Sequence, residues 1–218
     1  MSSADDELQP ERTEGFKVGE KKTIDEYQQL DQNDESLRKW KESLGLGSGT
    51  PLSDPNDPRK VIIKSLGLEV EGRPDIIINL DSPHALDTLK SKPFSIKEGA
   101  RFRMKATFKV QHQILSGLKY VQVVKRGPIS NKMQEMIVLI TLSIPFGHRQ
   151  RTAGLTVTQG SYSPNTSDKP IHEKKFESET APSGMMGRGH YNAVSKFIDD
   201  DNQTHLKFEW SFDIKKDW

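Results

Sequence analysis

The sequence predicts an all-β protein: an immunoglobulin-like antiparallel β-sandwich preceded by a largely flexible N-terminal arm with short helices. Three observations predict it. Apolar and polar residues alternate over 101–110 and 206–215, so each strand turns one face to a core and one to water. Turn signals separate several other short segments of strand composition. The first 60 residues contain only 13 hydrophobic residues, about 22%, against about 37% in the rest of the chain.

The predicted body extends from residue 60 to residue 218. Sheets with one wet face are typically antiparallel, and the two alternating segments fit that type. Because the chain has no cysteine, an immunoglobulin-like sandwich here would lack the disulfide between its sheets. The polar run 199–204 predicts a turn before the last strand. Further strands are expected at 61–70, 75–80, 93–97, 118–125, 161–163 and 190–198.

The predicted arm, residues 1–59, carries two helix signals. Segment 23–30 begins with Thr23 as a possible N-cap and continues with Glu26, which completes a capping box. Segment 34–44 begins at Asp34, a good N-cap, and is followed by a glycine that stops a helix. A glycine-rich linker follows at 45–51.

The second arm helix has a narrow apolar stripe made of Leu37, Trp40 and Leu44. An isolated helix of this length is marginal in water, so the stripe needs a surface to pack on. Two readings stay open: the stripe docks on the protein's own β-body, or it docks on a partner and becomes ordered there.

Charge and composition exclude several classes of protein. The formal net charge is +1, made of −5 in the first 60 residues and +6 in the rest, which argues against binding nucleic acid through bulk charge. The absence of cysteine excludes thiolate metal sites and cysteine nucleophiles. The polar N-terminus has no signal-peptide core, and no apolar run is long enough to span a bilayer, so a cytoplasmic location is expected.

The sequence shows no pattern of residues that is typical of a catalytic site. The six histidines do not pair at metal-ligand spacing, and no nucleophile-elbow motif occurs. The run Asp199–Asp201 lacks the spacing of a helical calcium loop. It fits either a solvated turn or an acidic patch for a basic partner. We therefore expect a protein without catalytic residues, metal or cofactor.

Several longer motifs follow one another along the chain: 30–41 with Asp54-Pro55-Asn56 in the arm, and 94–99, 114–122, 181–189, 197–201 and 206–218 in the body. Together these motifs resemble those of the Rho GDP-dissociation inhibitor family. The resemblance covers the chain from about residue 20 to its end, apart from one internal segment.

The resemblance implies a non-catalytic protein that binds GDP-loaded, geranylgeranylated Rho-family GTPases. It would form a heterodimer with the GTPase, block GDP release, and extract its partner into the cytosol after transient contact with the membrane surface. The arm would hold the switch regions of the GTPase. Asp34 and Ser36 would touch polar switch atoms, and Leu37, Trp40 and Leu44 would supply apolar contact.

The resemblance also implies a slot for the prenyl group between the sheets, although strand alternation alone does not separate pocket-lining side chains from ordinary core. Acidic side chains would face the basic tail that precedes the prenylated cysteine. The sequence departs from the family here, because Asn131 and Gln134 stand where acids are expected, and Lys174 and Lys175 add positive charge. The expected lining is Leu68, Val70, Phe108, Val110, Ile114, Leu118, Tyr120, Trp210 and Phe212. The expected acids are Glu177, Glu179, Asp199, Asp200 and Asp201.

One segment, 138–159, interrupts the resemblance. It begins with Val138 and ends with Gln159, whose codons can supply the GU and AG ends of an in-frame intron. We interpret the segment as a retained intron, and the alternative is a genuine surface hairpin or second binding element. Its first residues, Val138 to Ile144, are apolar and β-prone, which is an aggregation signature.

A second function class remains. The sandwich could carry other prenylated or acylated cargo without acting on GTPase switches. Asp34, Ser36 and the apolar stripe of the arm distinguish the two, because a pure lipid carrier has no need of them.

Overall fold

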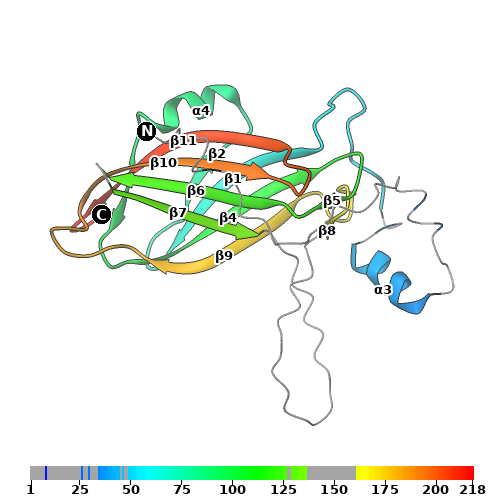
Figure 1. Ribbon diagram of the computed structural model, residues 1–218, viewed down its shortest axis with the longest axis horizontal. Coiled ribbons are helices and arrows are strands. Elements are labelled where there is room, and N and C mark those ends of the chain that lie inside the picture. The colour runs from blue at the N-terminus through cyan, green and yellow to red at the C-terminus, as the bar shows by residue number, and fades with distance from the viewer. Residues whose placement is uncertain are drawn as a thin grey trace, which may run out of the picture.

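The structure is a computed structural model that describes residues 8, 26, 29, 34–44, 46, 49–126, 129–136 and 161–218. In this part of the chain, two β-sheets pack face to face around an apolar core (Figure 1). The four-stranded sheet has the order β2-β1-β4-β9, with β1 Val61–Val70, β2 Ile76–Asn79, β4 Arg101–Val110 and β9 His172–Thr180. The five-stranded sheet has the order β3-β11-β10-β6-β7, with β3 Phe94–Lys97, β6 Lys119–Arg126, β7 Ile129–Met136, β10 Gly189–Ile198 and β11 Thr204–Lys215.

Neighbouring strands in both sheets run antiparallel, except that β3 lies parallel to β11. A small third sheet pairs β5 Leu115–Ser116 with β8 Ser161–Tyr162. The prediction of an all-β sandwich is therefore confirmed. The predicted turn before the last strand is also present, since β10 ends at Ile198 and β11 begins at Thr204.

Sequence patterning missed the two edge strands β7 and β9. In β9 the segment HEKKFESET buries only His172 and Phe176, and its other side chains are exposed or half-buried. Charged side chains are common on sheet edges, where they discourage pairing with other chains, and they hide the alternation that marks a central strand. Edge position thus explains why β9 reads as a polar loop.

In the described ranges, the helices α3 and α4 lie beside the sandwich. The helix α3, Glu35–Leu44, begins as predicted, because the Asp34 carboxylate accepts a hydrogen bond from the Ser36 amide at 2.8 Å. The helix α4, Pro83–Leu89, was not predicted. Its N-cap is Ser82, and two of its leucines, Leu86 and Leu89, pack against the core.

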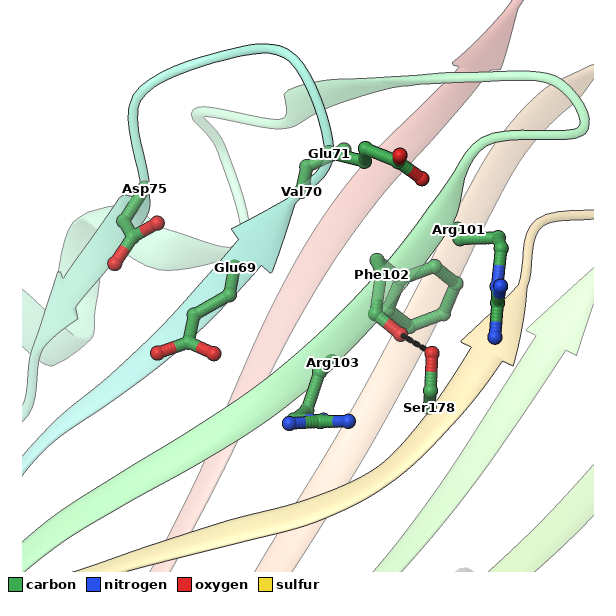
Figure 2. A pocket seen from close by; sticks show the side chains of 8 residues that line it. All are labelled: Glu69, Val70, Glu71, Asp75, Arg101, Phe102, Arg103 and Ser178. Carbon is green, nitrogen blue, oxygen red and sulfur yellow. Dashed lines mark hydrogen bonds between the residues drawn. The ribbon is translucent and has the colours of Figure 1, made fainter.

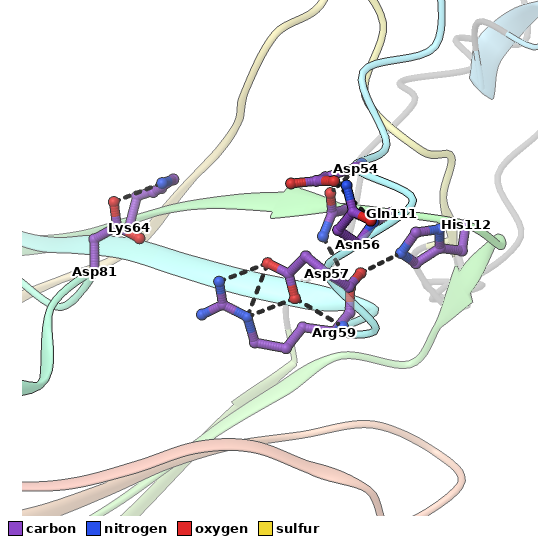
Figure 3. A network of polar contacts seen from close by, with 8 residues as sticks. All are labelled: Asp54, Asn56, Asp57, Arg59, Lys64, Asp81, Gln111 and His112. Carbon is purple, nitrogen blue, oxygen red and sulfur yellow. Dashed lines mark hydrogen bonds and ion pairs between the residues drawn. The ribbon is translucent and has the colours of Figure 1, made fainter.

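The Asp54-Pro55-Asn56 motif fastens the arm to the sandwich (Figure 3). The Asp54 amide donates to the Gln111 side chain at 2.9 Å, and Gln111 in turn donates to the Arg59 carbonyl at 3.0 Å. His112 reaches the Asp57 carbonyl at 2.7 Å. Hydrogen bonds from Arg59 lower the pKa of Asp57 to about 2. This motif therefore has a visible structural role where the chain enters β1.

The sandwich has two distinct ends. We call the end where the 181–188 connection joins β9 to β10 the cavity end, and the opposite end, which carries α3 and the turn between β10 and β11, the arm end (Figure 1). The segment 138–159 lies outside the described residues, as does most of 23–30. None of the helices in the described ranges is long and apolar enough to cross a membrane.

Candidate functional site

A cavity of about 320 Å³ opens between the two sheets at the cavity end. Its size falls within the range of small-molecule pockets, which is about 300–1,000 Å³. Both sheets contribute to it, and so does the start of the 181–188 connection. The lining residues are Leu68, Ile96, Phe102, Met104, Gln122, Val124, Glu179, Thr180, Ala181, Pro182, Tyr191, Trp210, Phe212 and Ile214.

One wall of the cavity is a row of stacked aromatic rings from β10 and β11. The Tyr191 and Phe212 rings are stacked with centroids 5.1 Å apart, and Phe212 lies 5.4 Å from Trp210. Phe94 of β3 stacks on the other face of this group, 5.5 Å from Trp210. Such pairs stabilise by more than their buried area and hold flat apolar surfaces in fixed positions. The wall therefore suits a hydrocarbon ligand.

Buried hydrogen bonds fix the inner end of the cavity. The Trp210 indole N–H donates to Ser195 Oγ at 2.8 Å, Ser195 contacts the Tyr120 hydroxyl at 2.9 Å, and Tyr120 donates to Gln122 Oε1 at 2.5 Å. The Tyr120 hydroxyl has a single hydrogen, which it donates to Gln122. The Ser195 hydroxyl is therefore the donor in its hydrogen bond with Tyr120. Burial raises the pKa of Tyr120 well above its ordinary value, so the phenol stays protonated and able to donate.

The mouth of the cavity is held by charged side chains around the 181–188 connection. The Arg188 guanidinium donates two hydrogen bonds of 2.7 Å to Glu98, which also accepts from the Gly184 amide at 2.8 Å. Arg126 donates to the carbonyls of Met186 and Arg188. Hydrogen bonding by Arg188 holds the pKa of Glu98 below its usual range. The connection is therefore tied to the turn between β3 and β4 and to the end of β6.

Glu179 is the acidic side chain of this lining. The residue as a whole is exposed, and partial burial of its carboxyl raises its pKa.

The structure divides the nine residues expected to line a prenyl slot. Leu68, Trp210 and Phe212 line the cavity. Phe108, Val110, Leu118 and Tyr120 lie in the closed core, each 1% exposed or less. Val70 is buried beside a separate outer groove, and Ile114 is half-buried just before β5.

Several lining residues were not anticipated, among them Ile96, Met104, Val124 and Tyr191. Period-two alternation identifies the inward face of a strand but not the level along the strand at which the sheets part. Met104 and Phe108 share the inward face of β4, yet one lines the cavity and the other fills the core. No pattern in the sequence therefore indicates the position along each strand at which the cavity begins.

The expected arm residues lie on or beside α3 at the arm end. Asp34 and Ser36 are exposed, and Leu44 is buried with 6% exposure. The Leu44 carbonyl accepts a hydrogen bond from Ser163 Oγ at 2.5 Å, which ties the end of α3 to the residue after β8. The backbones of Leu37 and Trp40 are helical, and their side chains lie outside the described part of the molecule.

The five expected acids do not form one group. Glu177 and Glu179 lie on β9 toward the cavity end, whereas Asp199, Asp200 and Asp201 lie in the turn at the arm end. Asp200 forms an ion pair of 3.0 Å with Lys119, and Asp199 accepts from His205 at 3.0 Å. The carboxylates of both aspartates are therefore engaged by other side chains of the same protein.

The balance of effects on Asp199 supports that structural role. Burial pushes its pKa upward, but hydrogen bonds from His205 and the Gln203 amide outweigh this effect and hold the pKa below its usual value. Among the described residues, no three histidine or acidic side chains gather in a way that could hold a metal ion.

Comparison with known proteins identifies the family. The family described as RHO protein GDP dissociation inhibitor matches residues 1–139 and 152–217, and the unmatched stretch falls within the segment 138–159. A Rho GDP-dissociation inhibitor of Saccharomyces cerevisiae is 42% identical over 204 residues, which cover 92% of this chain and 90% of that protein. The Schizosaccharomyces pombe inhibitor is 41% identical over 92% of this chain and 86% of its own length. Rho GDP-dissociation inhibitor 1 of Homo sapiens is 36% identical over 95% and 89%. The chain therefore belongs to the Rho GDP-dissociation inhibitor family.

Proposed function

We propose that the chain is a non-enzymatic regulator that binds GDP-loaded, geranylgeranylated Rho-family GTPases, slows GDP release, and removes them from membranes. The observation that carries the proposal is the aromatic-walled cavity between the sheets, found in a chain that matches the inhibitor family over most of its length. In the resulting heterodimer the prenyl group is buried in the cavity and the GTPase is held in the cytosol.

Burial of hydrocarbon supplies the free energy for extraction. Each buried CH₂ contributes ~0.8 kcal/mol, so a prenyl chain leaves a bilayer only for a site that is equally dry. In this proposal Leu68, Trp210 and Phe212 contact the lipid directly. Phe108, Val110, Leu118 and Tyr120 fill the closed core beyond the cavity, while Val70 lies beside the outer groove and Ile114 lies just before β5.

The arm acts on the GTPase rather than on the lipid. A ligand that fixes the switch loops slows GDP release without any chemistry of its own. Asp34, which caps α3, and Ser36, in its first turn, are both exposed and would bind polar switch atoms. Leu37 and Trp40 would supply apolar contact, and Leu44 anchors the end of the helix on the β-body.

The proposed contact with the basic tail of the GTPase rests on Glu177 and Glu179. These two acids lie on β9 toward the cavity end, where the tail that precedes the prenylated cysteine must arrive. Asp201 is the exposed member of the aspartate turn. Asp199 and Asp200 would contribute by shaping that turn, since His205 and Lys119 engage their carboxylates.

Extraction of a GDP-loaded, geranylgeranylated Rho-family GTPase from liposomes tests the proposal. The full chain and a variant lacking 138–159 are compared side by side. Extraction by both supports the function and makes the segment a tolerated insertion. Extraction by the shortened chain alone supports the function and the retained-intron interpretation. If both are folded and neither extracts the GTPase, the inhibitor proposal fails and a carrier of other prenylated or acylated cargo replaces it.

Substitution at Asp34 separates the arm from the pocket. Asp34→Ala removes both the charge and the helix cap, whereas Asp34→Asn removes the charge and keeps a capping side chain. We expect both variants to bind a geranylgeranylated peptide normally and to slow GDP release less than the parent chain. Loss confined to Asp34→Ala would assign the residue to helix capping alone.

The interpretation of 138–159 as a retained intron has its own test. Sequencing of the transcript should show messenger RNA that mostly lacks these codons. Messenger RNA that mostly contains them would contradict the interpretation and favour a genuine insertion between β7 and β8.

A further inference from the structure

The connection between β9 and β10 exposes two adjacent methionines. Met185 and Met186 are 85% and 86% exposed, more than any other large hydrophobic side chain in the described part of the chain. Ile77 follows at 68%, and the remaining ones are 46% exposed or less. Two neighbouring apolar side chains in water are unusual on a soluble protein surface and mark a contact site more often than a single one does.

This exposure is built into the fold rather than produced by a loose loop. Glu98 holds Arg188 and the Gly184 amide, and the Tyr191 hydroxyl donates to the Gly187 carbonyl at 2.6 Å. Gly184 has a φ of +81°, a conformation that other residues rarely adopt. The backbone on both sides of the two methionines is therefore fixed, and their side chains are held outward.

A groove of mixed charge lies on the four-stranded sheet, beside the end of the strand that leads into this connection (Figure 2). Arg101 and Arg103 of β4 stand in register with Thr180 and Ser178 of β9, the last strand before the connection. Neither guanidinium forms an ion pair with another side chain in the described ranges.

The acids of this groove are mostly neutralised within the sheet. Glu69 binds Lys175 at 2.8 Å and Lys105 at 3.2 Å, and Asp75 lies 3.6 Å from Lys105. Glu71 remains on the turn above the arginines (Figure 2). The groove thus leaves two guanidiniums against one carboxylate, so a polyanionic surface is the complementary partner.

The methionines and the arginines are both connected through the chain to residues that line the lipid cavity. Pro182 and Ala181, at the start of the same connection, line that cavity, and Phe102 lies between Arg101 and Arg103 and lines both the cavity and the groove. A surface that touches the methionines and the arginines would therefore face the cavity opening.

We propose that this end of the sandwich docks on an anionic lipid bilayer, with Met185 and Met186 inserted among the headgroups and Arg101 and Arg103 on lipid phosphates. The inference rests on the proposed function and adds to it the surface that meets the membrane. Docking in this orientation brings the cavity mouth to the bilayer, so a prenyl chain passes from lipid to protein with little exposure to water. Apolar insertion and basic attraction act together, as in other peripheral membrane contacts.

Vesicle binding by the full chain alone tests the docking surface. The probes are vesicles of phosphatidylcholine and vesicles that also contain phosphatidylserine. We expect binding to the anionic vesicles that weakens with added salt. Arg101→Gln with Arg103→Gln should weaken binding about 30-fold, from ~1 kcal/mol for each basic side chain near the surface. Met185→Gln with Met186→Gln should weaken it about tenfold.

The matched controls lie at the arm end. Lys169 and Ile171 are also exposed, and Lys169→Gln with Ile171→Gln should leave vesicle binding unchanged. Equal binding by the parent chain and the two cavity-end variants, or equal loss in the control, would overturn the docking surface.

Binding of a soluble geranylgeranylated peptide keeps this test separate from the proposed function. The methionine and arginine variants should bind the peptide as the parent does while extracting the GTPase from liposomes more slowly. Loss of peptide binding in these variants would assign the residues to the lipid site and contradict the docking proposal. A parent chain that fails to bind the peptide would instead refute the proposed function itself.

Discussion

The two ends of the sandwich are built from the same strands but packed in opposite ways. At the arm end, rings from both sheets meet and close the core: Tyr120 of β6 packs on Phe176 of β9 at 5.2 Å, and Phe108 of β4 contacts Tyr162 of β8 edge-on at 5.0 Å. At the cavity end, the aromatic rings stack along the five-stranded sheet and leave the facing space empty. Rings that meet across the sheets therefore help to fill the arm end, whereas rings stacked along one sheet line the cavity at the other end.

The largest expected effect on stability comes from removing a buried aromatic ring at the arm end. Phe108→Ala should lower the free energy of unfolding by about 3–5 kcal/mol, because a fully buried ring leaves a cavity in a packed region. Phe212→Ala, which enlarges a space that already exists, should cost less. Urea unfolding followed by circular dichroism measures both. Equal losses would contradict the distinction between the two ends.

Acid should also weaken the arm end through His172. Burial lowers the pKa of this residue to about 4, and its Nε2 lies 2.9 Å from the Ser163 carbonyl. The unfolded chain takes up a proton near the ordinary pKa of 6.5, before the folded chain does. Stability contributed by neutral His172 is therefore complete above pH 6.5 and falls by about 3 kcal/mol as the pH drops toward 4.

Unfolding free energies across this pH range, for the parent chain and His172→Gln, check the prediction. The variant cannot titrate at this position, so its stability should depend less steeply on pH. Parallel curves for the two proteins would show that another group causes the acid sensitivity.

A leucine-to-phenylalanine substitution at two neighbouring inward-facing positions of β1 compares the closed core with the cavity directly. Leu66 and Leu68 both face inward, but only Leu68 lines the cavity. Leu66→Phe should overpack the closed core, cost about 1–3 kcal/mol of stability and leave lipid binding intact. Leu68→Phe should occupy ligand space, weaken binding of a geranylgeranylated peptide about tenfold and change stability little. Equal behaviour of the two variants would remove the evidence for a site at this level.

The smallest effect on stability is expected from the hydrogen bond that ties the end of α3 to Ser163. Ser163→Ala removes the hydrogen bond to the Leu44 carbonyl, worth about 1 kcal/mol, and should release the end of α3. Limited proteolysis near residue 44 should then proceed roughly fivefold faster, while global unfolding stays nearly unchanged. Unchanged proteolysis would mean that other contacts hold the helix.

Sequence patterning predicted the fold class because burial has a period in strands. The segments 101–110 and 206–215 alternate, and both are strands with one face in the core. The start of α3 was also predictable, since a cap such as Asp34 acts within one turn of its helix. The charged edge strand β9 was missed because it buries too few side chains to show a period.

The candidate site was less predictable, because its geometry depends on contacts between distant residues. Trp210 was expected to line a pocket, but its hydrogen bond to Ser195 and the link to Tyr120 join three different strands. Likewise, Asp199 and Asp200 belong to an acidic run in the sequence, and only the fold shows that His205 and Lys119 engage them.

The most direct test of the central claim is photo-crosslinking with a geranylgeranylated peptide that carries a photoreactive group on its prenyl chain. After irradiation, mass spectrometry identifies the modified residues. A lipid held in the cavity should label side chains of its wall, such as Leu68, Met104 and Phe212, and excess unlabelled peptide should suppress the labelling. Labelling confined to the outer faces of the sheets or to α3, with none in the cavity, would contradict the account.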